Sequence, residues 1–445
     1  MFRWRVGLFY TNVYDSVWDD YNEYYLIFAI IMIKFNFFLL FFTSFLFSQT
    51  FKPVVPPKNI GGVVLFNPKT NDNTPIIQLG EQLILKFDDL DGTYKRYNYT
   101  IERYTHDWKP TSAFRTDYMV GFKQDFISDY KQSFNTSLKY THYRLAFPNN
   151  KINIRLSGNY VIKIYQTNPK KPIITKRFAV YESGVGIQSV ISQGRTKANE
   201  TQTISFDAVF NSQRYDLTRN IQDVWAMVIK NNNWNDALYN LNPDFVNNQK
   251  LTFNSIDYTF WAGNEYRWLD TKKRDAKALT TNNIEHDSIY HHYLMIDQPR
   301  THTGYINEPD YEGGYYIRTV DQMAEDNIDT QADYIDVHFA LEFFNPKKEV
   351  DIYVTGAFND WQLSKQNKMV FDEVNRYYKL NMLLKQGTYN YQYTFTKKET
   401  YEIINEEPEG NYWQTTNLYH TLLYYRPWGQ RYDLLIGISR IFSRE

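Results

Sequence analysis

The seven residues Tyr389-Asn390-Tyr391-Gln392-Tyr393-Thr394-Phe395 decide the fold class of this chain. Aromatic side chains take every odd position, and polar side chains take every even one. Successive side chains of a β-strand point to opposite faces of the sheet, so this period of two predicts a strand with one aromatic and one polar face. A helix would need a period near 3.6, which the stretch lacks.

The same signal continues outward from this stretch. Turn-forming pairs such as Asp91-Gly92 separate the apolar runs. Further strands are predicted at residues 83–87, 97–102, 160–165, 203–210, 223–229, 350–358, 377–384 and 418–425. Because no long apolar stripe at helical spacing occurs, helices should be short and few, and we predict an all-β chain.

Composition supports a β-rich chain and excludes several functions. Tyrosine (39), phenylalanine (31) and tryptophan (10) are abundant among the 445 residues, and aromatic residues favour half-buried strand surfaces. The 49 basic residues balance 50 acidic ones without a basic stripe, which argues against nucleic acid as a partner. The absence of cysteine excludes disulfides, thiolate metal sites, a cysteine nucleophile and a lipoprotein anchor.

The N-terminal segment predicts export. Residues 24–47 are apolar apart from Lys34, Asn36 and two hydroxyl residues, a length that would span a bilayer. We favour a second interpretation, in which Met32 is the true start, Lys34 supplies the positive charge and cleavage follows Ser48. Residues 1–31 are then an upstream mis-start and residues 32–48 a signal peptide. An uncleaved membrane anchor is the alternative.

Turn-rich segments divide the mature chain into three tandem immunoglobulin-like β-sandwich domains. The first domain is predicted at residues 59–182 and the second at residues 201–317. Between them, the small, polar and glycine-bearing segment 183–200 is predicted to be a linker. An acidic linker at 318–332 then leads to the C-terminal domain at 333–437, and residues 438–445 form a tail.

Motifs for catalysis or metal binding are scarce. The chain holds no G-x-S-x-G elbow, H-E-x-x-H helix or phosphate loop, so we expect no enzyme, no cofactor and no small-molecule substrate. His286, His291 and His292 match no known ligand spacing, and adjacent strand residues face opposite ways, so we expect exposed loop histidines and no metal. The acidic run 88–91 resembles the start of a calcium loop, but no glutamate takes the twelfth position, which favours a hairpin turn. An enzyme site assembled from distant residues is a remaining alternative.

Trp361 ends the motif Gly356-Ala357-Phe358-Asn359-Asp360-Trp361, which resembles a strand-turn segment of early-set, glycogen-binding-like modules. Two interpretations are open for this tryptophan. It stacks on a sugar, or it is a buried core residue next to an Asn359-Asp360 turn, which we favour.

The C-terminal run around Arg426-Pro427-Trp428 and Arg431-Tyr432-Asp433 is a candidate partner interface. Arginine and aromatic residues are enriched at interface hot spots, and the run follows the last clear strand. The alternative is a solvated tail that packs back on its own domain.

Several stretches together resemble the type IX secretion system plug family, formerly a domain of unknown function of Bacteroidota. They are spread in order over nearly the whole mature chain. Those that carry the resemblance are residues 76–83, 87–92, 99–102, 107–108, 140–145, 147–148, 156–160, 263–267, 384–387, 389–393, 426–427 and 431–433.

The resemblance implies a periplasmic protein at the inner face of the outer membrane, a monomer within a larger complex. Its partner would be the barrel of the outer-membrane type IX translocon, whose pore it would close when no substrate passes. The family offers no catalytic residues. The alternative function is a carbohydrate-binding envelope protein, suggested by the aromatic content and by Trp361.

Overall fold

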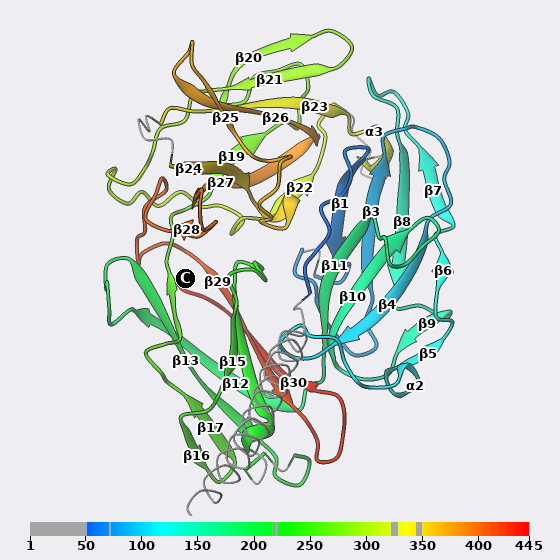
Figure 1. The fold of residues 1–445 in the computed structure, drawn as a ribbon, viewed down its shortest axis with the longest axis vertical. Helices are drawn as coiled ribbons and strands as arrows, with labels where there is room; N and C mark the ends of the chain where they lie inside the picture. Colours follow the sequence, from blue (N-terminus) through cyan, green and yellow to red (C-terminus); the bar gives the residue numbers. More distant parts are fainter. Residues whose placement is uncertain are drawn as a thin grey trace, which may run out of the picture. The chain divides into compact units, whose positions relative to one another are not determined.

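The alternating aromatic residues 389–395 lie on β27 (Gly387–Lys397), an eleven-residue strand of the computed structural model (Figure 1). The structure describes residues 51–70, 73–215, 217–218, 221–321, 328–343 and 349–444. The predicted mis-start at 1–31 and signal peptide at 32–48 lie outside these residues. The all-β prediction is confirmed, because helices α2 (Arg115–Tyr118) and α3 (Ile328–Gln331) have only four residues each. Neither they nor any other described helix combines the length and apolarity needed to cross a bilayer.

β27 is buried on both faces. Tyr389, Tyr391 and Tyr393 lie in an aromatic core. On the opposite face, Asn390 is also fully buried, and its side-chain oxygen accepts a hydrogen bond from the backbone N–H of Tyr311. Both faces of β27 are therefore covered by protein. The aromatic side chains face an apolar core, and Asn390 faces a polar segment of the chain and not water.

The first sandwich packs a four-stranded sheet on a five-stranded sheet around one core. The four-stranded sheet contains, in order, β1 (Ile60–Phe66), β3 (Leu83–Asp89), β8 (Thr141–Phe147) and β7 (Asp129–Gln132). The five-stranded sheet contains β2 (Ile76–Gln78), β11 (Ile174–Tyr181), β10 (Gly158–Tyr165), β4 (Asn98–Tyr104) and β6 (Asp125–Phe126). A small pair, β5 (Met119–Gly121) with β9 (Ile152–Ile154), closes one end.

The second sandwich is discontinuous in sequence (Figure 1). One sheet contains β12 (Val185–Gln193), β13 (Thr201–Phe210), β17 (Lys250–Phe253) and β16 (Phe245–Asn247), with β18 (Thr259–Trp261) also paired to β13. The other contains β15 (Leu238–Leu241), β14 (Val224–Lys230), β29 (Leu418–Tyr425) and β30 (Leu434–Phe442). A short 3-10 turn, Ile221–Asp223, leads into β14.

Two predicted boundaries are therefore wrong. The expected linker at 183–200 holds β12, whose half-buried isoleucines pack on the second core. The expected third domain at 333–437 and tail at 438–445 include β29 and β30, which belong to the second sandwich because β14 pairs with β29 along its whole length.

The third sandwich fills the interval between β18 and β29. One sheet centres on β27, which pairs with β19 (Arg267–Asp270), β22 (Tyr315–Ile317), β24 (Val350–Thr355) and β28 (Ile403–Ile404). The other contains β20 (Thr281–His286), β21 (Tyr290–Leu294), β23 (Tyr334–Leu341), β26 (Tyr377–Lys385) and β25 (Val370–Asp372). Residues 267–317, expected in the second domain, thus contribute four strands here, and the predicted linker at 318–332 contains α3.

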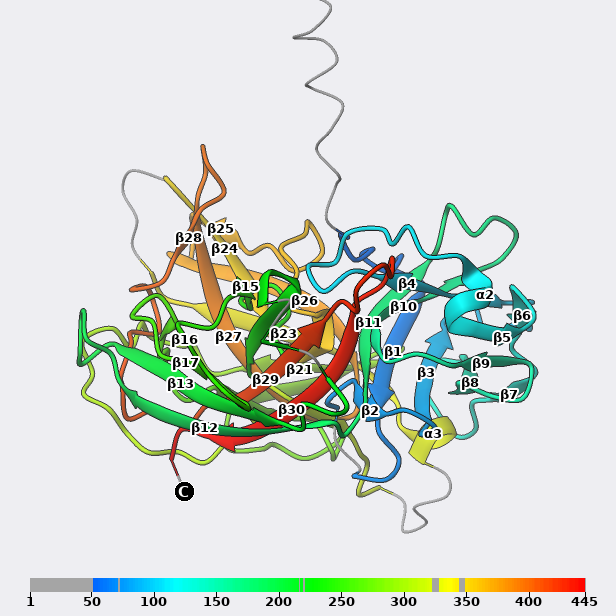
Figure 2. The same ribbon diagram turned by 90° about the horizontal axis from the view of Figure 1, so that it is seen from below.

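The first sandwich is joined to the second by an apolar core and to the third by a buried ion pair. Val161 and Ala179 of the first sandwich lie in one buried cluster with Met227, Leu422 and Leu435 of the second. Figure 2 shows β11 beside β30 at this junction. Such shared cores resist relative movement of neighbouring domains, because separating them exposes apolar surface to water.

At the other junction, the carboxylate of Asp88 on β3 is fully buried against β26 of the third sandwich. The Nζ atom of Lys385 lies 2.6 Å from its Oδ2 atom. The Tyr334 hydroxyl donates to the same oxygen at 2.7 Å, and Nδ1 of His142 lies 2.6 Å from Oδ1. Burial by itself raises the pKa of Asp88, but Lys385 and His142 outweigh it and hold this pKa below its ordinary value.

Two glycines permit this close approach. A Cβ atom at Gly61 would lie 2.7 Å from the hydroxyl oxygen of Tyr334. Gly62 has a φ of +55° and lies at a β-bulge between β1 and β3, a backbone conformation that favours glycine. Asp88 and Asp89 are the buried last residues of β3. The prediction of a hairpin turn at residues 88–91 is wrong, because the next strand, β4, belongs to the opposite sheet.

Candidate partner interface

The predicted interface residues form an arch, residues 426–433, that connects β29 to β30. Its base is closed by Arg426, whose Nε atom donates to Oδ1 of Asp433 at 2.7 Å. Its tip turns at Gly429, which has a φ of +75°, and the backbone N–H of Gln430 donates to the carbonyl of Pro427. The arch is therefore an ordered loop between two strands and not a terminal tail.

Asp433 attaches the base of the arch to the first sandwich. It is 2% exposed, and its Oδ2 atom accepts a hydrogen bond from the backbone N–H of His106 at 2.9 Å. The His106 ring lies at the same distance from Oδ2. Burial raises the pKa of Asp433, but the contacts with His106 and Arg426 prevail and lower it to about 2. Asp433 thus has a structural role, together with Arg103, which donates to its backbone carbonyl.

The tip of the arch faces solvent. Trp428 is 78% exposed, although an indole ring gains free energy when it leaves water. Arg431 follows three residues later in the arch, and its guanidinium lies 5.5 Å from the ring centre of Phe114. Tyr432 lies below the tip, under the guanidinium of Arg103.

Exposed aromatic residues of the first sandwich extend this surface. Phe114 is 64% and Phe122 65% exposed, and Arg115 connects the two by donating hydrogen bonds to the carbonyls of Gly121 and Phe122. We call Phe114, Phe122, Trp428 and Arg431 the aromatic rim. Apolar residues beside arginine on an exposed surface are typical of protein interfaces. The rim includes two of the predicted residues, Trp428 and Arg431, and two phenylalanines that were not predicted from the sequence.

Trp361 lies at a different place, where all three sandwiches meet. Its neighbour Asp360 bonds Nζ of Lys176 in the first sandwich at 2.7 Å, and the Asp360 carbonyl accepts from Asn235 of the second. The indole is half-buried, so close to Gly313 that a Cβ atom there would lie 2.9 Å from the ring. This packing favours a structural role for Trp361 over a sugar-stacking platform.

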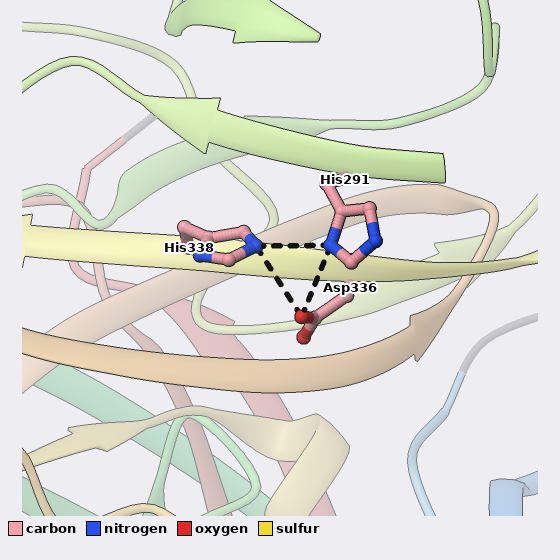
Figure 3. Close-up of side chains that lie close together, drawn as sticks. All are labelled: His291, Asp336 and His338. Atoms are coloured by element: carbon pink, nitrogen blue, oxygen red, sulfur yellow. Dashed lines mark hydrogen bonds and ion pairs between the residues drawn. The ribbon is translucent and has the colours of Figure 1, made fainter. Parts of the chain in front are cut away.

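The three histidines singled out in the sequence are separated by the fold. His286 is exposed on β20, and His292 is fully buried on β21, with its Nε2 atom 2.9 Å from the carbonyl oxygen of Arg274. The expectation of exposed loop histidines is therefore wrong, because all three lie on strands and only His286 is exposed. His291 points to the opposite face of β21, where it meets Asp336 and His338 of β23 (Figure 3). In the sequence, only the spacing of Asp336 and His338, two residues apart on one strand, indicated that these side chains share a face.

Comparison with known proteins identifies a family and similar solved structures. The family model described as the type 9 secretion system plug protein first domain matches residues 60–182, which form the first sandwich. The crystal structure of a hypothetical protein from Parabacteroides merdae ATCC 43184 superposes with a TM-score of 0.82 at 31% identity, covering 88% of this chain and 100% of that one. The crystal structure of a putative membrane anchored protein from Corynebacterium diphtheriae has a TM-score of 0.14 at 8% identity, covering 86% of this chain and 91% of that one. The search of curated proteins found no match.

The fold defines a class of protein: three β-sandwiches joined by buried contacts, with an exposed aromatic rim. Within that class, the chain belongs to the type 9 secretion system plug family. Its role is therefore connected with that secretion system.

Proposed function

We propose that this protein is the periplasmic plug of a type 9 translocon, docking on the periplasmic mouth of the outer-membrane barrel and closing its pore when no substrate passes. The observation that carries the proposal is the family match over the first sandwich. It acts by contact and not by catalysis, as a monomer within the larger complex.

The packing of the three sandwiches supports this role. A plug must cover a pore without deforming, and the shared apolar core and the buried ion pair of Asp88 with Lys385 hold neighbouring sandwiches together. It must also be released when a substrate arrives, which favours a contact through a limited surface over a large obligate interface. The aromatic rim is such a surface.

Loss of the protein is expected to raise the permeability of the outer membrane, because an unplugged channel passes small solutes. The measurement is entry of a dye or antibiotic in a strain lacking the gene. The increase should disappear when the translocon barrel is deleted as well. Unchanged entry in the single deletion would contradict the proposed function.

The double substitution Trp428→Ala/Arg431→Glu is expected to weaken docking on the barrel. Hot-spot residues of this type contribute about 2 kcal/mol or more each, which corresponds to about 30-fold or more in affinity. The measurement is binding of the purified variant to the solubilised barrel. Unchanged binding would place the contact elsewhere on the molecule.

The control is Phe245→Ala, which removes an aromatic side chain of similar exposure, 68%, from β16. It should bind like the unmodified protein. Deleting residues 417–445 is unsuitable for this purpose, because it removes two strands of the second sandwich along with the arch.

A further inference from the structure

Three side chains on the outer face of the third sandwich form a compact triangle. They are His291 of β21 and Asp336 and His338 of the neighbouring parallel strand β23 (Figure 3). Nδ1 of His291 lies 3.2 Å from Nε2 of His338. Each of these nitrogens lies 3.3 Å from the same oxygen, Oδ2 of Asp336. The three ligand atoms therefore lie within 3.3 Å of one another.

The dimensions of this triangle suit a tetrahedral metal ion. Zinc binds imidazole nitrogen at about 2.0–2.1 Å and carboxylate oxygen at about 2.0–2.2 Å, so two ligands of one tetrahedron lie about 3.3–3.4 Å apart. An octahedral ion with the same bond lengths would need separations of about 3.0 Å. The observed separations of 3.2 to 3.3 Å match one face of the tetrahedron.

Neighbouring side chains orient the two histidines as ligand rings are oriented in metal sites. The second ring nitrogen of His291, Nε2, lies 3.3 Å from Oδ1 of Asp287, the carboxylate partner that typically fixes the tautomer of a ligating histidine. Tyr293 stacks on the His338 ring at 4.1 Å between centres. With neutral imidazoles, Asp336 and Asp287 give the site two negative charges, which favours a divalent cation.

The site is also accessible. The side chains of His291, Asp336 and His338 are each about one fifth exposed, so an ion can enter from solvent. Three protein ligands leave the fourth tetrahedral position open for water.

We propose that His291, Asp336 and His338 bind a divalent transition-metal ion of the zinc type. The bound ion would clamp β21 to β23, a parallel pair on the outer face of the third sandwich. This goes beyond the proposed plug function and departs from the expectation, drawn from the sequence, that no metal is bound.

The test is titration of the purified, chelator-treated mature chain with Zn²⁺, followed by calorimetry, with Co²⁺ absorption as a second measure of tetrahedral coordination. One equivalent should bind. Asp336→Asn, which keeps the shape of the side chain, should weaken binding at least about tenfold, and His338→Gln should do the same. Asp287→Asn should weaken it by about tenfold through His291.

The matched control is His286→Gln, because His286 is an exposed histidine of the same hairpin that lies outside the triangle. It should leave zinc affinity unchanged. Thermal unfolding without metal establishes that each variant is folded, and zinc should raise the melting temperature of the unmodified chain but not that of Asp336→Asn. Absence of stoichiometric binding, or equal affinity in Asp336→Asn and the unmodified chain, would overturn the proposal.

Discussion

Replacing Lys385 with methionine is expected to lower the free energy of unfolding by about 3 to 5 kcal/mol. Removing one partner of a buried ion pair leaves the other charge without compensation, and that cost is of this size. The carboxylate of Asp88 would then be fully buried with only His142 and Tyr334 to stabilise it. Chemical denaturation at neutral pH measures the loss.

Two further variants isolate the cause of that loss. Lys379 lies on the same strand as Lys385, and Lys379→Met breaks its ion pair with Asp372 of β25. Because the Lys379 side chain is 53% exposed, this change should lower the free energy of unfolding far less than Lys385→Met. Adding Asp88→Asn to Lys385→Met removes the unpaired charge and should restore part of the stability. If Lys385→Met proved as mild as Lys379→Met, the buried pair would not hold the first and third sandwiches together.

Acidification is expected to destabilise the protein through His420, well above the pH at which carboxylates titrate. His420 lies on β29, fully buried, and its Nδ1 atom has no hydrogen-bond partner among the described residues. Burial, with a smaller effect of Arg440, lowers the pKa of His420 from 6.5 to about 3. Because the unfolded chain takes up a proton below about pH 6.5 and the folded chain does not, stability is full above that pH and falls toward pH 3.

The expected loss through His420 is about 2 to 3 kcal/mol between pH 6.5 and 4.5. The measurement is the free energy of unfolding at several pH values, compared with His420→Gln, whose curve should be flatter by that amount. The pKa of His292 is lowered by burial as well. His292 is present in both proteins, so its contribution to the pH dependence cancels in the comparison. Glu409, whose pKa is lowered to about 2 where Arg267 and Arg300 outweigh its burial, loses its contribution only at lower pH. Parallel curves for the two proteins would refute the role of His420.

The sequence predicted the strands well and their partners poorly. Residues 418–425 were predicted as a strand, and β29 has the same bounds. β29 pairs at seven positions with β14, which lies nearly two hundred residues earlier in the chain. No local sequence signal predicts this pairing, because the same apolar strand could pack in either of two neighbouring domains. The prediction of a linker at 183–200 was wrong for a related reason. β12 lies at the edge of its sheet and exposes polar residues on one face, and that composition also suits a connection.

For the candidate sites, too, residues close in sequence could be predicted, whereas contacts between distant segments could not. Trp428 was recognisable because arginine and aromatic residues cluster within one short run of sequence. The rim phenylalanines were not, because Phe114 meets Arg431 only where the arch docks on the first sandwich, and Phe122 is linked to the rim through Arg115. In the His291 triangle, Asp336 and His338 share one strand face by period two, but their meeting with His291 depends on a parallel pairing across more than forty residues.

The discontinuous second sandwich sets the order of folding in a chain that emerges from its N-terminal end. The first sandwich is complete once Tyr181 has emerged, whereas β14 keeps one edge unpaired until β29 arrives. Pairing between strands so far apart in sequence is slow, and an unpaired apolar strand promotes aggregation until its partner binds. A prematurely terminated chain therefore retains a complete first sandwich but leaves the second sandwich with an unpaired apolar edge.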